Sequence, residues 1–239
     1  MNRQTQKDLQ NIVQKNYEEV AELYSETRKK VLWPELMAIA SVVKAGQSVL
    51  DVGCGSGKLL QAFTEKEINY LGIDPSKKLV KLARSEWGEN EKRKFSEGDI
   101  LDLGKVSETE FDFVFCIAVL QHIPGEKLRI QALRQLRNKV KKDGVIVISN
   151  WNMWSEAFAK KKFVKLIFKF FLLKLIGKNK MDFGDVLFDW KNPQGYSVSK
   201  RYYHAFRLGE LKALVKKSGL KLEKITKDSH NFYLVLRKS

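Results

Sequence analysis

Short apolar runs alternate with amphipathic segments through the middle of the chain. Runs typical of buried strands begin at Ser48, Tyr70, Phe95, Phe111 and Val145. Between them, apolar residues recur at the spacing of one helix face over residues 58–66, 76–87 and 126–141. Strands and helices that alternate in this way predict an α/β fold with a doubly wound, mostly parallel sheet.

The two ends of the chain complete this plan. Residues 1–44 have helical periodicity, with an interruption predicted at 25–28. Near the other end a helix is expected over 208–218, and two closely spaced strands, 220–226 and 231–236, are expected to pair antiparallel. The plan therefore has seven strands. We divide the chain into N-terminal helices (1–44), a core (45–150), an insert (151–200) and a C-terminal part of the same domain (201–239).

The first strand ends in a loop of three alternating glycines, Gly53, Gly55 and Gly57. Glycine is needed where a chain turns sharply out of a strand and its backbone approaches a ligand, because no Cβ stands in the way. An acid, Asp51, lies inside the strand end. Nicotinamide dehydrogenases have a related loop, but their glycines follow the spacing Gly-x-Gly-x-x-Gly, which differs from this one. The loop predicts a nucleotide-like ligand of another kind.

Two later strands also end in acids. Asp74 closes the second strand, at a position where nucleotide-binding α/β folds bind the two ribose hydroxyls. Asp99 closes the third strand, with Ile100 beside it, and a fourth strand runs through Ile117. Together with the glycine loop, this series resembles the class I S-adenosylmethionine-dependent methyltransferases over residues 45–150.

The resemblance implies which residues hold S-adenosylmethionine. The three glycines would pass under its amino-acid part, Asp74 would hold the ribose, and Asp99 with Ile100 the adenine. Further cofactor contacts are expected from Tyr24, Arg28, Asp51, Ile117, Gln121 and His122. In this plan residues 45–150 are the cofactor-binding core, and the helices of residues 1–44 cover the site.

The composition adds a strong positive charge. The 239 residues include 44 Lys and Arg against 28 Asp and Glu, a formal net charge of +16. This excess predicts a polyanionic partner, either nucleic acid or an anionic membrane, although a role in solubility alone stays open. Cys54 and Cys116 are expected to be small buried residues in a reducing, cytoplasmic compartment. Three histidines and two distant cysteines have no metal-ligand spacing, so no structural zinc is expected in this chain.

Within the insert, which is predicted to be helical, residues 157–181 form a basic, aromatic-rich segment. They contain eight lysines and no acid, interleaved with Phe, Leu and Ile. The longest apolar run, residues 170–173, is too short to cross a bilayer. Three interpretations are open: a helix packed on the core with a solvated lysine face, a surface for an RNA backbone, and an interfacial helix in peripheral contact with a membrane.

Motifs outside the core narrow the resemblance. Tyr24-Ser-Glu-Thr-Arg28 and Trp33-Pro34 precede the glycine loop, and the cluster Arg201-Tyr-Tyr-His204 follows the insert. Over residues 17–239, apart from the insert, the combination resembles the eukaryotic-type tRNA methyltransferases that esterify 5-carboxymethyluridine at the wobble position. It also resembles the methyltransferase domain fused to AlkB-type hydroxylases. The resemblance implies tRNA, bound at its anticodon loop, as the substrate, and a small zinc-binding activator subunit as a partner.

The chain departs from this family mainly near the acceptor. Ser56 replaces the usual Asn of the glycine loop, and Leu120-Gln121-His122 stands where the family often has two histidines. Of the family's terminal Asp-Asn-Trp-Trp motif, this chain keeps Asn231 alone. The sequence therefore defines the acceptor site less closely than the cofactor site.

Esterification makes small chemical demands. A carboxylate nucleophile is already ionised at neutral pH, so we assign no catalytic base, and alignment in a water-poor site would supply the catalysis. Residues that position the acceptor carboxylate are expected instead: Arg28, Arg201, Tyr203 and His204, with Asn231 in support. A guanidinium suits this task because it binds a carboxylate through two hydrogen bonds, although either arginine could equally form a structural salt bridge or contact a phosphate.

Two other function classes fit parts of the sequence. A membrane-associated methyltransferase acting on lipids or small molecules would use the insert as an interfacial anchor. A non-catalytic RNA-binding protein could retain a cofactor-binding fold, but the intact acids at Asp51, Asp74 and Asp99 argue against it.

Overall fold

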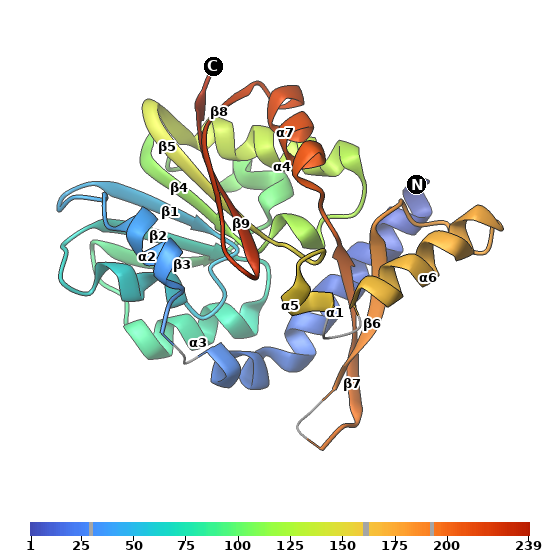
Figure 1. The fold of residues 1–239 in the computed structure, drawn as a ribbon. Helices are drawn as coiled ribbons and strands as arrows, with labels where there is room; N and C mark the ends of the chain where they lie inside the picture. The colour runs from blue at the N-terminus through green and yellow to red at the C-terminus, as the bar shows by residue number, and fades with distance from the viewer. Residues whose placement is uncertain (29–30, 160–162, 192–193) are drawn as a thin grey trace.

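A seven-stranded sheet forms the centre of the protein. The computed structural model describes residues 1–28, 31–159, 163–191 and 194–239, and of residues 24–28 and 159 it describes only the backbone. Within those residues the strands of the sheet are β1 (Ser48–Val52), β2 (Asn69–Asp74), β3 (Arg93–Glu97), β4 (Phe111–Ile117), β5 (Val140–Trp151), β8 (Leu220–Lys227) and β9 (Asn231–Lys238). Their order across the sheet is β3-β2-β1-β4-β5-β9-β8 (Figure 1).

The strand directions agree with the sequence prediction. Strands β1 to β5 are parallel, and β9 runs antiparallel to both of its neighbours, β5 and β8. The seven-strand sheet and its antiparallel closing pair are therefore confirmed. The strand order reverses between β1 and β4, which is the point at which open α/β sheets bind their ligands.

Helices cover both faces of the sheet. One face carries α4 (Glu126–Lys139), α7 (Leu208–Lys217) and the 3-10 helix η2 (Ile100–Lys105), and the other carries α2 (Pro34–Ala40), η1 (Lys58–Phe63) and α3 (Lys77–Trp87). Neighbouring residues of β1 pack on opposite faces: Leu50 lies in the apolar cluster with α4 and α7, and Val49 in the cluster with α2 and α3. Parallel strands that are buried on both faces must be apolar throughout, which is the pattern of the central runs.

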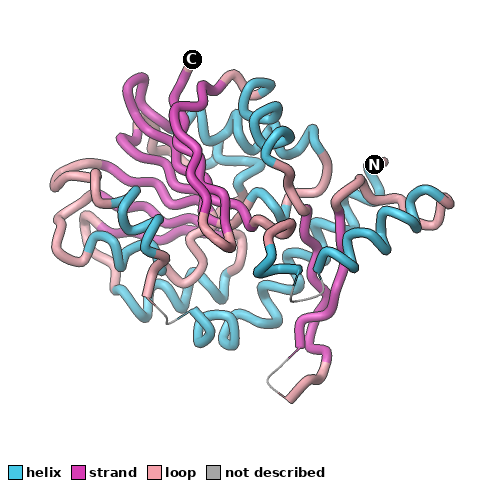
Figure 2. Tube along the Cα trace, viewed as in Figure 1, coloured by secondary structure: helices cyan, strands magenta, loops and turns pink. Residues whose placement is uncertain are grey.

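A second, two-stranded sheet lies beside the main one. β6 (Asp185–Lys191) and β7 (Ser197–His204) pair antiparallel and stand apart from the seven strands (Figure 2). Three helices belong to this part of the molecule: α1 (Arg3–Arg28), α5 (Glu156–Ala159) and α6 (Phe163–Leu175). Leu9 of α1 shares a buried cluster with Tyr202 of β7. The helical insert predicted from sequence therefore also contains β6 and the start of β7.

Three sequence predictions are corrected by the structure. The interruption at 25–28 is wrong, because the backbone of α1 stays helical through Arg28, and the segment holds neither glycine nor proline to end it. The segment after the glycine loop is the short 3-10 helix η1, rather than an α-helix reaching residue 66. β5 begins at Val140 rather than Val145, with a register shift opposite Phe111 and Phe113.

In the described ranges we find no helix with both the length and the apolar character needed to cross a membrane. The two cysteines are buried as predicted, and burial raises the pKa of both the Cys54 and the Cys116 thiol. Neither side chain is therefore activated as a nucleophile.

Candidate active site

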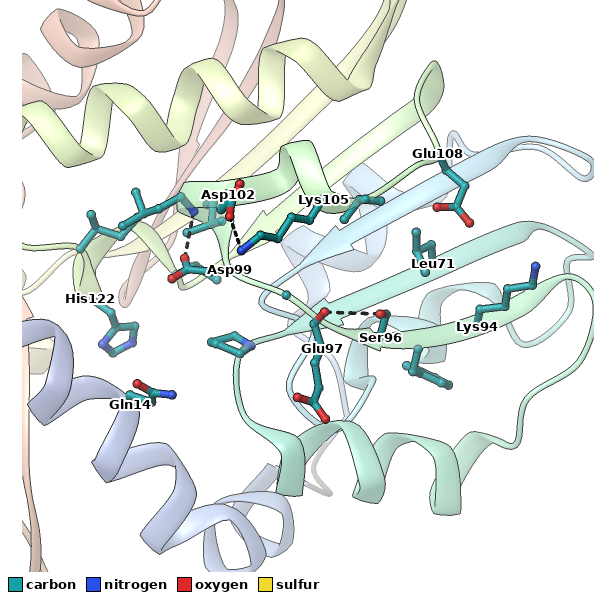
Figure 3. A pocket seen from close by; sticks show the side chains of 18 of the residues that line it. Gln14, Leu71, Lys94, Ser96, Glu97, Asp99, Asp102, Lys105, Glu108 and His122 are labelled. Atoms are coloured by element: carbon teal, nitrogen blue, oxygen red, sulfur yellow. Dashed lines mark hydrogen bonds and ion pairs between the residues drawn. The ribbon is translucent and has the colours of Figure 1, made fainter.

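A large cleft opens at the carboxyl ends of β3 and β4. Its volume is about 1030 Å³, and α1 bounds it opposite the loops that follow the two strands (Figure 3). Asp99 and Ile100 line it after β3, His122 lines it from the turn η3 (Leu120–His122) after β4, and Gln14 lines it from α1. The Asp99 carboxylate is exposed and accepts a hydrogen bond of 2.9 Å from the N–H of Leu101. The cleft thus gathers an acid and an apolar side chain that the sequence assigns to the adenine.

The glycine loop after β1 is shaped by its contacts with two neighbouring segments. Gly53 has a φ of +76°, and a Cβ added there would lie 2.3 Å from Cγ2 of Val119. The N–H groups of Gly53 and Cys54 both donate to the carbonyl oxygen of Ile73 in β2, at 2.7 and 3.0 Å. Glycine alone permits both this backbone conformation and this approach to Val119, which itself lines the cleft.

Asp74, at the end of β2, holds the glycine loop in place. Its Oδ2 accepts a hydrogen bond from the N–H of Gly55 and its Oδ1 one from the N–H of Ser76, both at 2.9 Å. Burial raises the pKa of this carboxyl to about 6, against the opposing effect of the two backbone hydrogen bonds. Asp74 is not among the described residues that line the cleft; in this structure its carboxylate bonds to the loop and to the start of α3.

Asp51 lies beneath the loop, beside a small cavity of about 70 Å³ that Trp33 and Ile117 also line. Its carboxylate accepts a hydrogen bond of 2.8 Å from the Tyr70 hydroxyl. Burial raises the pKa of Asp51 to about 7; the Tyr70 hydrogen bond lowers it, and the nearby Asp74 raises it further. A positively charged group in the cavity would stabilise the ionised form of Asp51.

A third space, which we call the aromatic cavity, lies between the main sheet and the β6–β7 hairpin. Its volume is about 360 Å³, and its lining residues are Trp33, Trp151, Phe158, Phe163, Phe188, Arg201, Tyr203, His230 and Asn231. Three of them, Arg201, Tyr203 and Asn231, are residues that the sequence predicts for acceptor binding. Trp33 also lines the small cavity beside Asp51, so the two spaces are neighbours.

Arg201 places a buried cation on the wall of the aromatic cavity. Its Nε donates to Oδ1 of Asn16 in α1 at 3.1 Å, its Nη1 donates to the Tyr203 hydroxyl at 3.2 Å, and its guanidinium stacks on the ring of Trp190. The Nη2 of Arg201 and the Oδ1 of Asn231 are both buried, without a hydrogen-bond partner in the described part of the chain. An unpaired buried donor or acceptor costs about 1–3 kcal/mol, and a polar ligand in the aromatic cavity would relieve this cost at both atoms.

His122 and Tyr203 form the wall between the cleft and the aromatic cavity. Their ring centroids lie 4.6 Å apart, and His122 lines the cleft whereas Tyr203 lines the aromatic cavity. The hydroxyl of Tyr17 in α1 lies 2.8 Å from Nε2 of His122. Groups bound in the two spaces would therefore lie on opposite sides of this pair of rings.

The turn after β4 is strained. Ala118 has a φ of +57°, uncommon for a residue other than glycine, and its N–H donates to the carbonyl oxygen of Ser149 at 3.0 Å. Such strain concentrates at functional sites. Gln121, predicted as a cofactor contact, is buried, and its Oε1 accepts a hydrogen bond of 3.3 Å from the N–H of Trp151. Like the Nη2 of Arg201, the Nε2 of Gln121 has no hydrogen-bond partner among the described residues.

His204, predicted beside the acceptor, lies in a separate buried network. Its Nδ1 is 2.6 Å from Oδ1 of Asp185, and its Nε2 is 2.8 Å from Oε1 of Glu210. Arg129 forms ion pairs with the same two acids, and the Tyr202 hydroxyl donates to Asp185 at 2.8 Å. Burial acts to raise the pKa of Asp185, but His204 and Arg129 hold it below its usual value. The network joins α4 and α7 to the hairpin.

Two predicted residues, Tyr24 and Arg28, lie outside the described side chains, and their roles stay predictions. The structure adds two residues of α1 that the sequence did not single out for the site, Asn16 and Tyr17. Their spacing marks them as part of an amphipathic helix, and nothing local reveals what they touch. The one signal in the sequence is that Asn16 falls on the apolar face of this helix, where a buried amide needs a hydrogen-bond partner.

The family of the chain follows from comparison with known proteins. A family model described as a methyltransferase domain matches residues 18–225. The chain belongs to this family. It is an S-adenosylmethionine-dependent methyltransferase, and the resemblance found from the glycine loop and its acids is confirmed.

Two relatives have the same name, tRNA (carboxymethyluridine(34)-5-O)-methyltransferase. The one from Schizosaccharomyces pombe is 27% identical over 226 residues, which are 93% of this chain and 94% of the relative. The one from Saccharomyces cerevisiae is 34% identical over 142 residues, which are 59% of this chain and 48% of the relative. The chain thus spans nearly all of the first relative and about half of the second.

Solved structures agree with the fold. An S-adenosylmethionine-dependent methyltransferase from Methanosarcina mazei superposes with a TM-score of 0.67 at 18% identity, covering 87% of this chain and 99% of that one. A methyltransferase of Haloferax volcanii, solved in complex with the Trm112 methyltransferase activator, has a TM-score of 0.63 at 15% identity, covering 94% and 96%. At these identities the likeness concerns the fold alone.

The residues present fit the cofactor. Asp51 offers a buried carboxylate whose pKa is raised by burial and by the nearby Asp74, and the cationic amino group of S-adenosylmethionine would stabilise its ionised form. A Cβ at position 53 would fill the turn where the loop passes Val119. The cleft beyond it is roomy enough for a nucleoside, because ligand pockets of about 300–1,000 Å³ hold molecules of this size.

Proposed function

We propose that this methyltransferase esterifies the carboxylate of a 5-carboxymethyl group on the wobble uridine of tRNA. The names of the two relatives support this acceptor, as does the net charge of +16, which favours a polyanionic substrate. The observation that carries the proposal is the aromatic cavity, where an unpaired N–H of Arg201 and an unpaired oxygen of Asn231 are buried among aromatic rings.

The aromatic cavity has the chemistry of a site for one uridine base. Trp33, Trp151 and Phe188 offer ring faces on which a base drawn out of a loop stacks. The side-chain Oδ1 of Asn231 is an acceptor for the N3–H of uracil, and the Nη2 of Arg201 is a donor for the carboxylate. Arg201 forms a charge-assisted hydrogen bond there, which is shorter and stronger than a neutral one.

For the cofactor, we propose the following contacts. Asp51 pairs with the amino group, the loop from Gly53 to Gly57 passes beneath the amino-acid part, and Asp99 with Ile100 binds the adenine. Asp74 accepts the ribose hydroxyls in addition to the two backbone N–H groups, because each carboxylate oxygen accepts more than one hydrogen bond. Tyr24, Arg28, Ile117, Gln121 and His122 complete the proposed set.

When bound, S-adenosylmethionine supplies an electrophilic methyl group on a positively charged sulfur, and transfer to a carboxylate requires no proton from the protein. The protein's own task is therefore alignment and exclusion of water. Arg201 directs the carboxylate, and Asn16 and Tyr203 direct Arg201 through its Nε and Nη1. Trp33 lines both the small cavity beside Asp51 and the aromatic cavity, and we propose that the methyl group and the carboxylate approach each other at this ring.

A small activator subunit is a further proposed partner. Its support is the Haloferax volcanii structure, a methyltransferase of the same fold in complex with the Trm112 activator. The main sheet has two edge strands in the described residues, β3 and β8, and an edge strand offers unpaired backbone groups for strand addition. The activator would dock on one of these edges.

The test uses two tRNAs of identical sequence, one with 5-carboxymethyluridine at the wobble position and one with unmodified uridine. With labelled S-adenosylmethionine, the first tRNA gains label and the second does not. If both are labelled equally, or neither is with the activator present, the acceptor assignment is wrong.

A matched pair of variants tests the role of the cavity. Arg201→Lys keeps the charge but loses the planar fork, and it lowers kcat/KM for the modified tRNA by about 100-fold, as expected for loss of a buried charge-assisted contact. Arg134→Lys, on the exposed side of α4, leaves kcat/KM unchanged. Cofactor affinity, measured by calorimetry, stays within about twofold of the parent in both variants.

A further inference from the structure

The outer face of α6 exposes large apolar side chains to water. We call it the outer apolar face; it consists of Phe168, Phe171, Leu172, Leu175 and Ile176, with Phe183 just beyond the helix. Phe168, Leu175 and Ile176 are 61%, 61% and 64% exposed. The ring of Phe171 contacts those of Phe168 and Phe183, with centroids 5.9 and 5.3 Å apart, so the apolar surface is continuous. A continuous exposed apolar patch marks an interaction surface.

The opposite side of α6 is anchored in the protein. Ile167 is buried in a cluster with Val186 and Tyr203 of the hairpin, and Phe163 and Phe170 pack against the same region. The helix therefore cannot rotate to bury its outer residues. It projects at one side of the molecule, beside the hairpin and away from β2 and β3 (Figure 1).

Lysines flank the outer apolar face. Lys165 and Lys169 line a shallow groove together with Phe168 and Leu172. Lys178 and Lys180 are exposed just after the helix. From residue 157 to residue 181 the sequence contains eight lysines but neither an acid nor an arginine. No acid within residues 157–181 therefore balances the positive charge of the segment.

We propose that the outer apolar face of α6 binds the surface of a membrane that contains anionic lipids. Helices that lie in such an interface place Phe and Leu in the boundary of the acyl chains, while lysine stems extend along them and carry the charge to the phosphates. Each exposed lysine gains from the negative surface potential. The proposal concerns attachment of the enzyme and is independent of the methyl acceptor.

The same face suits RNA or a second copy of the chain less well. Leu172, Leu175 and Ile176 have no ring with which to stack on bases, and recognition of phosphate through two hydrogen bonds requires arginine, which the segment lacks. A symmetric contact between two copies would bring two lysine-rich faces together without any acid of the segment to pair them.

The test measures co-sedimentation of the full chain with vesicles. One set is made of phosphatidylcholine alone, and the other of phosphatidylcholine and phosphatidylglycerol in equal parts. The protein sediments with the anionic vesicles and stays in solution with the neutral ones. The triple variant Phe168→Gln/Leu172→Gln/Leu175→Gln weakens this binding by about tenfold or more, because the inserted apolar area is lost.

Two controls separate the face from general effects. Val42→Gln/Val198→Gln replaces apolar residues that are 59% and 41% exposed elsewhere, and it leaves vesicle binding unchanged. Lys165→Gln/Lys169→Gln weakens binding by about tenfold, whereas Lys212→Gln/Lys216→Gln, an equal change of charge on α7, weakens it by less than about threefold. Unchanged cofactor affinity shows that each variant is folded.

Several outcomes would overturn the proposal. These are equal binding to neutral vesicles, no binding to either kind, or the same loss in the control variants. If the triple variant instead loses affinity for tRNA while the parent ignores vesicles, the face belongs to RNA. If it turns a dimeric parent that ignores vesicles into a monomer, the face belongs to a second copy.

Discussion

Replacing Gly53 by alanine tests whether the glycine loop needs its close approach to Val119. Two effects are expected. An alanine at φ +76° is strained, and its Cβ would lie 2.3 Å from the Val119 side chain, well inside ordinary contact distance. Backbone strain of this kind costs about 1–2 kcal/mol, and forcing an extra methyl group into a packed site costs about 1–3 kcal/mol more.

Gly46→Ala is the matched control for Gly53→Ala. Gly46 also has a positive φ, +80°, but a Cβ there meets nothing within 4 Å, so this variant shows the strain without the clash. Urea unfolding measures the free energy of unfolding, and calorimetry measures the Kd for S-adenosylmethionine. We expect Gly46→Ala to lose about 1–2 kcal/mol with an unchanged Kd.

Gly53→Ala should lose a further ~1–3 kcal/mol of unfolding free energy, and its Kd should rise by about tenfold or more. The Kd rises because Val119, which must move, also lines the cleft. Equal stability of the two variants, or cofactor binding by Gly53→Ala as tight as that of the parent, would show that the approach to Val119 does not matter.

Three further predictions concern other parts of the site. Asn16→Ala removes the hydrogen-bond partner of the Arg201 Nε. In steady-state assays it should lower kcat/KM for modified tRNA by about tenfold, with the cofactor Kd unchanged. An unchanged kcat/KM would contradict the positioning role of Asn16. Cofactor affinity, measured by calorimetry, should rise with pH from about 5 and level off above about 8, because the cofactor requires ionised carboxylates and burial raises the pKa of Asp51 to about 7 and of Asp74 to about 6. A pH-independent Kd would argue against these contacts. Asp185→Asn removes the carboxylate that both Arg129 and His204 contact in the buried network. It should lower the free energy of unfolding, measured in urea, by about 3 kcal/mol, and a loss below about 1 kcal/mol would show that the network is not structural.

The cofactor half of the site could be predicted from sequence because its signals are local. Each acid closes its own apolar run, and parallel strands place their carboxyl ends at one edge of the sheet. Asp51 and Asp99 accordingly line the small cavity and the cleft at that edge. Asp74 ends β2 as predicted, and its role at the ribose stays a prediction; its hydrogen bond to the glycine loop could not be predicted from spacing.

The acceptor half depends on contacts between distant parts of the chain. The hydrogen bond from Arg201 to Asn16 joins residues 185 positions apart, and no pattern in the sequence links them. Alternation along β7 would have helped, because successive residues of a strand point to opposite faces. Arg201 and Tyr203 line the aromatic cavity, whereas Tyr202 and His204 join the buried network on the other face. If residues 197–204 are treated as a strand, His204 is expected on the face opposite to Arg201 and Tyr203.

The central claim, that the acceptor is a carboxylate, is tested most directly by the stability of the product. Methyl esters are cleaved by mild alkali, whereas methyl groups on nitrogen or carbon are not. Modified tRNA labelled by the enzyme with S-adenosylmethionine should therefore release its label as volatile methanol when treated with mild alkali. Label that stays on the tRNA through this treatment would contradict the account.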